Sequence, residues 1–233
     1  MIFKSIPYND SNNLSRSTTK ELESLDCNVV DQFGATDDDL RHLFLLMQSI
    51  SQVDKNYLNY YWDELKKKPQ ELLERTFAYE LYRQWQNKIE KYKTDLIVNA
   101  EIGKKISNSI DDLKKIMKLR LSYKEPDMVL HESHTDLANN IIVCEIKRNK
   151  GLSTQKIYND ILKICTFVGK NIWNGKGYHL GCFIVVDIDF QSFSTKLKSM
   201  KFRLNKHYQK IYCIVYNGKN LEYDTLYNII KNK

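Results

Sequence analysis

Apolar residues recur at two spacings along the chain, and these spacings separate the expected helices from the expected strands. Spacings of three and four residues predict helices over 36–50, 56–67, 70–93, 107–119, 153–173 and 192–200, and a short helix at the C-terminus. Short apolar and β-branched runs predict strands over 95–101, 125–130, 140–147, 181–186 and 211–216, the fourth of them apolar on both faces and therefore central. This order indicates an α/β fold with a mixed sheet flanked by helices.

The predicted elements divide the chain into two parts. Residues 1–35 are polar, and we expect them to be irregular or loosely attached. Thr36 and the three aspartates that follow it are typical of a helix start. The next predicted helix should stop before Pro69, because proline disrupts a helix interior. We therefore expect a polar lead-in and small helical region over 1–69, packed on a main domain over 70–233.

Charged residues interrupt the apolar pattern near the end of the strand predicted over 140–147. Alternation places Ile142, Cys144 and Ile146 on one face of this strand, and Ile141, Val143, Glu145 and Lys147 on the other. A buried carboxylate or ammonium is costly without an ionic partner or a bound ion, so Glu145 and Lys147 call for one. Asp127 directly follows Pro126, and a hairpin of the two strands would bring Asp127 close to Glu145.

Asp127, Glu145 and Lys147 together suit metal-assisted phosphate chemistry. Two carboxylates, with waters and a substrate phosphate, provide the oxygen ligands that Mg²⁺ prefers, and Mn²⁺ can substitute for it. The cation would polarise the scissile phosphate and lower the pKa of a bound water, which Lys147 would orient or help deprotonate. The sequence therefore predicts a metal-dependent nuclease in which Asp127 and Glu145 are metal ligands.

Pro126-Asp127 and Glu145-x-Lys147 resemble the signature of the PD-(D/E)xK nuclease superfamily. The resemblance covers residues 70–186. It implies a restriction-endonuclease-like fold with an αβββαβ core, and Mg²⁺-dependent hydrolysis of phosphodiester bonds, in DNA rather than RNA. The helix predicted over 107–119 departs from this pattern, because many members have a tight turn between the first two core strands.

The resemblance also implies two further kinds of site residue. The family places a carboxylate on its first helix to assist the metal, and Glu80 fits this role at the edge of the apolar stripe. An ordinary exposed pair of Glu80 with Arg83 or Gln84 is the alternative. The family often places a basic or amide residue near the start of the helix after the ExK strand. Gln155 and Lys156 match that place.

The charge balance favours a polyanionic partner, which we expect to be nucleic acid. The net charge of +7 arises from 36 basic and 29 acidic residues, a moderate excess. Basic residues near the proposed site are expected to contact phosphates without reading sequence: Arg148, Lys150, Lys156, Lys170 and Lys176. The alternative is a solvated basic face. The sequence leaves open whether the chain forms a homodimer or works with a separate specificity subunit.

Four other polar residues near the predicted strands have simpler interpretations. His131 and His134 form an HxxH pair, but no further soft ligand is suitably spaced for zinc, so we interpret them as turn residues. Asp187 and Asp189 follow the strand over 181–186, and we interpret them as caps of the next helix or turn.

Cysteine usage and apolar run lengths favour a cytoplasmic protein. The five cysteines show no CxxC or Cys/His spacing, and four lie in apolar runs, as small buried hydrophobes in a reducing compartment do. No apolar run approaches the ~20 residues that cross a bilayer, so we expect no membrane partner. Two rival functions stay open. One is an inactive nuclease-fold module that binds nucleic acid or a protein, and the other is an α/β domain with a coincidental motif.

Overall fold

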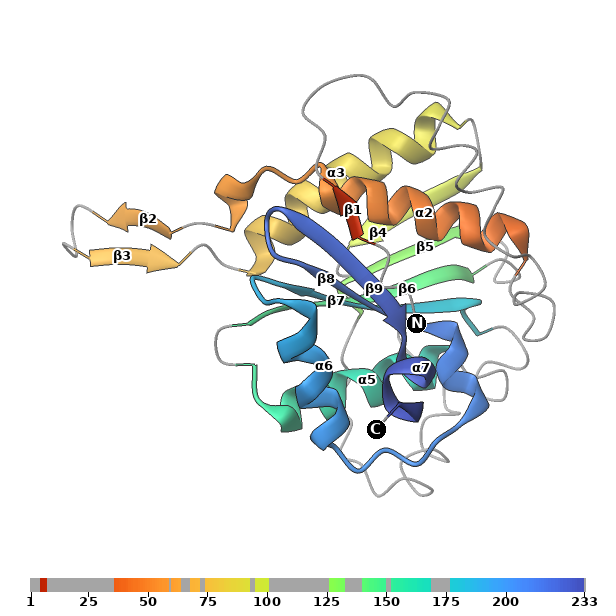
Figure 1. Ribbon diagram of the computed structural model, residues 1–233. Coiled ribbons are helices and arrows are strands. Elements are labelled where there is room, and N and C mark those ends of the chain that lie inside the picture. Colours follow the sequence, from red (N-terminus) through yellow and green to blue (C-terminus); the bar gives the residue numbers. More distant parts are fainter. Residues whose placement is uncertain are drawn as a thin grey trace, which may run out of the picture.

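A mixed β-sheet forms the centre of the molecule in the computed structural model (Figure 1). The structure describes residues 5–7, 36–58, 60–63, 68–71, 74–92, 95–100, 126–132, 140–149, 152–168 and 177–232. Within them the sheet runs in the order β1 (Ser5–Pro7), β9 (Asn220–Thr225), β8 (Ile211–Tyr216), β7 (Leu180–Val186), β6 (Asn140–Arg148), β5 (Met128–Glu132) and β4 (Leu96–Ala100). The central strands β6, β7 and β8 are parallel, and the other neighbours pair antiparallel.

Helices cover both faces of this sheet, as the sequence predicts. The helices α2 (Asp37–Ser51) and α3 (Glu74–Lys91) lie on one face, and α5 (Thr154–Val168), α6 (Phe190–Ser199) and α7 (Leu226–Lys231) on the other (Figure 1). Short 3₁₀ turns are η2 (Lys55–Tyr57) and η3 (Lys206–Lys210), and a hairpin of β2 (Tyr60–Asp63) and β3 (Lys68–Glu71) extends from the sheet. None of the described helices is long and apolar enough to cross a membrane.

The alternation expected along β6 divides the interior into two cores. Ile142, Cys144 and Ile146 belong to the core beneath α2 and α3, and Val143 to the core beneath α5. Ile141, which was expected on the face of Val143, belongs to the first core instead. β7 is buried at every position, which confirms it as a central strand with helices on both sides. Each fully buried aliphatic side chain contributes about 1.5–3 kcal/mol, so these two apolar layers hold β6 in place.

The predicted start of the first helix is confirmed at Thr36. Its side chain accepts a hydrogen bond from the Asp39 backbone at 3.2 Å, and Asp39 accepts one from the Thr36 backbone at 2.7 Å. This reciprocal cap satisfies two backbone donors that the helix leaves open. The other carboxylate oxygen of Asp39 lies 2.8 Å from His179, which fixes the start of α2 beside β7.

The helix predicted over 56–67 is wrong. Among the described residues of this range only η2 is helical, and β2 then pairs with β3, with Trp62 opposite Pro69. Consecutive aromatic residues suit a strand better than a helix, and proline is tolerated in an edge strand. Because β3 occupies residues 68–71, α3 begins at Glu74, four residues later than expected.

Other sequence expectations have mixed outcomes. The strand β9 was not predicted, because its acids Glu222 and Asp224 break the apolar pattern. The helix expected over 107–119 lies outside the described residues, as does the lead-in apart from β1. Gly218 has a φ of 86° in the turn between β8 and β9, a conformation that glycine adopts without strain. Among the described cysteines none forms a disulfide, and three of the four are buried.

Candidate active site

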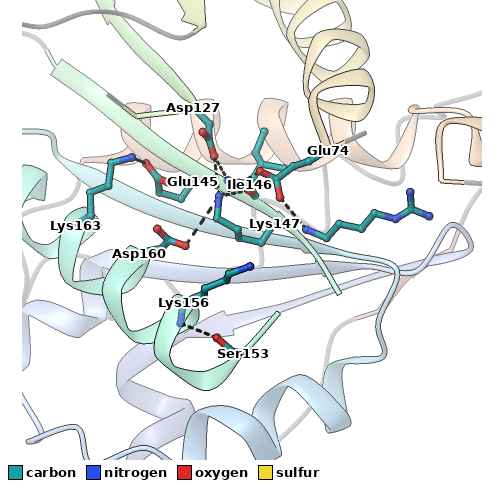
Figure 2. A network of polar contacts seen from close by, with 10 residues as sticks. Glu74, Asp127, Glu145, Ile146, Lys147, Ser153, Lys156, Asp160 and Lys163 are labelled. Carbon is teal, nitrogen blue, oxygen red and sulfur yellow. Dashed lines mark hydrogen bonds and ion pairs between the residues drawn. The ribbon is translucent and has the colours of Figure 1, made fainter. Parts of the chain in front are cut away.

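The hairpin of β5 and β6 brings the predicted Asp, Glu and Lys together at one end of the sheet. Met128 pairs with Cys144, so Asp127 and Glu145 flank the same point of the antiparallel ladder. The Ile146 backbone donates a hydrogen bond to Asp127 Oδ2 at 2.7 Å, which locks the Asp127 carboxylate onto β6. Figure 2 shows both carboxylates beside Lys147.

Lys147 lies among three carboxylates that come from three elements. Its Nζ is 3.3 Å from Glu74 of α3, 3.5 Å from Asp127, and 4.0 Å from Asp160 of α5 (Figure 2). The same ammonium donates to the Ile146 carbonyl at 2.8 Å. Burial alone would lower the pKa of Lys147, but the surrounding carboxylates, Asp127 foremost, outweigh it and raise the pKa above its ordinary value. The ammonium therefore stays charged.

Glu145 is almost fully buried and faces a second lysine. Its side chain is 1% exposed, and its Oε1 lies 2.5 Å from Lys163 Nζ, which is itself 8% exposed. Burial and the nearby charge of Asp127 raise the pKa of Glu145 to about 8, although Lys163 and Lys147 act in the opposite direction. A carboxyl with such a pKa accepts a cation or a proton readily near neutral pH.

Glu74 fastens the beginning of α3 to the end of β6. One oxygen reaches Lys147, and the other accepts a hydrogen bond from the Arg148 backbone at 3.2 Å. Glu74 thus contributes a carboxylate to this cluster from α3, the helix on which the sequence pointed to Glu80.

Glu80 makes its described contacts along its own helix instead. Arg83 donates to both of its oxygens at 2.9 and 2.6 Å, and Gln84 donates at 2.7 Å. The Arg83 hydrogen bonds lower the pKa of Glu80. Among the described contacts, none joins Glu80 to Asp127, Glu145 or Lys147.

A positional signal could have found two of the three additional residues, Asp160 and Lys163, but not Glu74. Asp160 lies three residues after Ile157, on the buried stripe of α5, whereas Glu74 is 39% exposed at the beginning of α3, where Glu80 is the buried acid. A charged residue at a stripe position faces the sheet rather than solvent. Lys163 follows Asp160 at a spacing of three, so it shares that face.

The predicted phosphate-contact residues differ in exposure. Arg148 is 7% exposed, and its guanidinium donates to the Leu58 carbonyl at 2.5 Å and to Asp187 at 3.4 Å. Gln155 and Lys156 are exposed at the beginning of α5, where Gln155 donates to Asn159 and the Lys156 backbone to Ser153. Three others lie outside the described residues: Lys150, Lys170 and Lys176.

The remaining polar candidates have structural partners. His131 lies within β5 rather than in a turn, and its Nε2 is 2.6 Å from the Asn99 amide. His134 lies outside the described residues. Asp189 caps α6 by accepting from the Ser192 backbone at 2.8 Å, as predicted. Asp187 faces the Arg148 guanidinium and adopts a φ of 66°, which few residues other than glycine tolerate.

The charges of this cluster do not balance. Among the described residues, Glu74, Asp127, Glu145 and Asp160 pair with the ammonium groups of Lys147 and Lys163. These six groups would sum to two negative charges if all were ionised, and to one while Glu145, with its pKa of about 8, holds a proton. The described residues contain no three side chains arranged as a ready-made metal site, because Lys147 lies between the carboxylates.

The fold and the site together define an α/β protein with a carboxylate and lysine cluster at the end of its central strands. Comparison of the chain with family models, with curated proteins and with solved structures found no match. The chemistry of the cluster is therefore the basis for assigning a function.

Proposed function

We propose that this protein is a Mg²⁺-dependent nuclease that hydrolyses phosphodiester bonds, with DNA favoured over RNA as the substrate. The observation that carries the proposal is the convergence of Asp127, Glu145 and Lys147 at the end of two paired strands, with Glu74 joining them from the preceding helix. A structural strand pair has little need for such a set.

The order of elements supports a restriction-endonuclease-like core. The described chain runs α3, β4, β5, β6, α5 and β7, which agrees with the αβββαβ order of that fold. The three strands β4 to β6 are antiparallel, and β7 returns parallel to β6 after a helical crossover. In this interpretation Glu74 takes the part of the first-helix carboxylate, because it contacts Lys147 and Glu80 does not.

The donor set fits a hard divalent cation. Carboxylate oxygens are the ligands that Mg²⁺ and Mn²⁺ prefer, and the cluster has four carboxyl groups against two ammonium groups. Asp127 and Glu145 would hold the cation, with Glu74 assisting, in competition with the two lysines for the same oxygens. When bound, the cation would polarise the scissile phosphate and lower the pKa of a bound water.

The residues of the chain then have separate tasks. Lys147 stays cationic, so it suits orienting a water and offsetting negative charge on the phosphate better than removing a proton. Glu74 and Asp160 hold the Lys147 ammonium in position from two sides. Lys163 compensates the charge of the buried Glu145. No covalent enzyme intermediate is required.

A second candidate is an inactive module of the same fold that binds nucleic acid or a protein. The specific observation in its favour is that Lys147 and Lys163 already pair with the carboxylates, as in a purely structural ion network. The unbalanced charge of the cluster speaks against this candidate.

Cleavage assays separate the two candidates. Supercoiled plasmid, linear duplex DNA and RNA of equal length are incubated with the protein in Mg²⁺, Mn²⁺ or EDTA. We expect metal-dependent cleavage of DNA that is lost in Asp127→Asn and Lys147→Ala and kept in Asp38→Asn, an exposed aspartate on α2. Cleavage that survives both site substitutions would refute the assignment. Absence of cleavage, with salt-sensitive DNA binding, would favour the module.

A further inference from the structure

The positive charge of the chain is concentrated in one short segment outside the cluster. Residues 196–210, which we name the basic segment, contain five lysines, one arginine and no acidic residue. The segment therefore carries six of the seven net positive charges of the protein, and the rest of the chain is nearly neutral. A local excess of this size needs counter-charges from outside the chain.

Four cations of the basic segment form no ion pair with any other described residue. Lys201, Arg203 and Lys206 are exposed, and within the described part of the chain none of them, nor Lys198, forms an ion pair. By contrast Arg41 and Arg83, two other exposed arginines, each pair with a carboxylate three residues away. The basic segment thus presents its charge to the surroundings.

Aromatic packing holds the basic segment in a fixed place. The ring of Phe202 lies 5.1 Å from that of Tyr158 on α5 and 6.0 Å from that of Tyr208 in η3. Asn205 caps η3 by accepting from the His207 backbone at 3.0 Å. Since Phe202 and Tyr208 anchor the segment, the cations between them form a preorganised surface, and a ligand need not order them.

The segment begins beside the candidate active site. Lys196 donates a hydrogen bond to Asn149 at 3.4 Å, and Asn149 follows Lys147 by two residues in the sequence. From there the segment leaves α6 and passes along the side of the sheet that α5 and α7 cover (Figure 1). A long polyanion bound at the cluster could therefore continue along the basic segment.

We propose that the basic segment is a nucleic-acid-binding surface that contacts the phosphates of duplex DNA outside the cleavage site. The choice of DNA as the polyanion rests on the proposed function. Exposed lysines and arginines neutralise phosphates by releasing condensed counterions, which provides affinity without sequence readout. Anionic lipid headgroups are the competing source of phosphate, and the test below separates them.

The test compares two triple variants, each of which removes two lysines and one arginine. Lys201→Ala/Arg203→Ala/Lys206→Ala alters the basic segment. Arg41→Ala/Lys91→Ala/Lys219→Ala removes two lysines and one arginine, all exposed, from α2, α3 and the β8–β9 turn. Binding to a labelled duplex is measured by fluorescence anisotropy in EDTA, which prevents cleavage, over a range of salt concentrations. Circular dichroism verifies that each variant folds.

We expect the basic-segment variant to bind duplex DNA at least about tenfold more weakly, with a salt slope reduced by about 0.9 for each lost phosphate contact. The control variant should keep most of its affinity and slope. Equal losses of DNA affinity in both variants would overturn the proposal, because positive charge at any surface position would then contribute equally to binding. No loss in either would overturn it too, as would a loss of binding to phosphatidylserine vesicles with DNA binding unchanged.

Failure of this proposal can be told apart from failure of the proposed function. DNA binding through the basic segment with no cleavage by the wild-type protein in Mg²⁺ would leave the surface standing and remove the nuclease. Metal-dependent cleavage by the wild-type protein, with unchanged DNA binding in the basic-segment variant, would support the nuclease and refute the binding surface.

Discussion

At the scale of the residue, the ammonium of Lys147 links the parts of the cluster. It lies within 4.0 Å of Glu74, Asp127 and Asp160, which come from α3, the start of β5 and α5. Three carboxylates fix its position more closely than one could, because each restricts a different direction. A group that orients water must be held in this way, since small misplacements reduce rates strongly.

Glu74 and Glu80 are a matched pair on one helix, and they test which carboxylate serves the site. We expect Glu74→Gln to reduce kcat/KM for DNA cleavage by about 10- to 100-fold, as losses of supporting partners at metal sites do. Glu80→Gln should leave kcat/KM within about twofold, because its described partners are Arg83 and Gln84. Steady-state kinetics in Mg²⁺ measures both. A larger loss of kcat/KM for Glu80→Gln than for Glu74→Gln would mean that Glu80 is the helix carboxylate that assists the site.

Glu145 should make the stability of the metal-free protein depend on pH. Its folded-state pKa of about 8 lies above the model-compound value of 4.5, so the folded state binds the proton more tightly than the unfolded state. This contribution to stability is complete below about pH 4.5 and is lost as the pH rises through 8, on the order of 5 kcal/mol in all. The Glu145→Gln variant has no titratable side chain at this position, so it lacks this pH dependence.

Urea unfolding in EDTA at several pH values measures this effect. The stability of the wild-type protein should fall relative to Glu145→Gln between about pH 5 and pH 9. Loss of the Lys163 partner in the variant adds an offset that stays constant over this range, so only the slope is interpreted. A difference that does not change with pH would mean that Glu145 is ionised throughout.

At the scale of the element, the close approach of β7 to α5 sets the position of two cluster residues. A Cβ at Gly181 would press against Ile164 Cγ2 and lie 3.0 Å from Val168 Cγ2. Both neighbours lie on the face of α5 next to Asp160 and Lys163. Glycine at this place therefore lets the helix pack close enough for Lys163 to reach Glu145.

Gly181→Ala should destabilise the protein by about 1–3 kcal/mol, as overpacking of a filled core does. Ile164→Ala removes the Cγ2 atom, so Gly181→Ala should cost clearly less in that background. Denaturant unfolding of both single variants and the double variant gives the coupling energy. Additive losses would show that the contact does not control the packing of α5 on β7.

Elements whose apolar spacing fits only a helix or only a strand could be predicted from the sequence, and elements whose spacing fits both could not. The strand β7 is apolar throughout, and the stripe of α3 includes Phe77, Leu81 and Trp85, so both were found. β2 lies within the stretch 56–67, whose apolar residues also fit a helix, but in the structure β2 pairs with β3. Spacing alone cannot decide such a case.

The site shows the same division between local and tertiary information. Asp127, Glu145 and Lys147 could be placed because they lie on neighbouring strands whose alternation is a local rule. Glu74 and Asp160 reach Lys147 only through the packing of α3 and α5 on the sheet, so choosing Glu74 over Glu80 required the three-dimensional arrangement. A charged residue on a buried helical stripe is a signal that would have found Asp160, but on α3 it favours Glu80 over Glu74.

At the scale of the whole molecule, negative and positive charge are separated. The cluster at the end of β5 and β6 has four carboxyl groups against two ammonium groups, whereas the basic segment carries six positive charges. A divalent cation at the cluster would convert it from a site that repels phosphate into one that attracts it. Binding of nucleic acid along the basic segment and binding of the cation should therefore support each other.

The charge excess of the cluster also predicts that a divalent cation stabilises the whole fold. A ligand that binds only the folded state adds about 2.7 kcal/mol at a concentration 100 times its Kd. We expect Mg²⁺ to raise the free energy of unfolding of the wild-type protein relative to EDTA at matched ionic strength. Asp127→Asn should lose this gain and Glu80→Gln should keep it. Urea unfolding measures the difference without any need for activity, and an equal Mg²⁺ effect in all three proteins would show that the cation binds elsewhere.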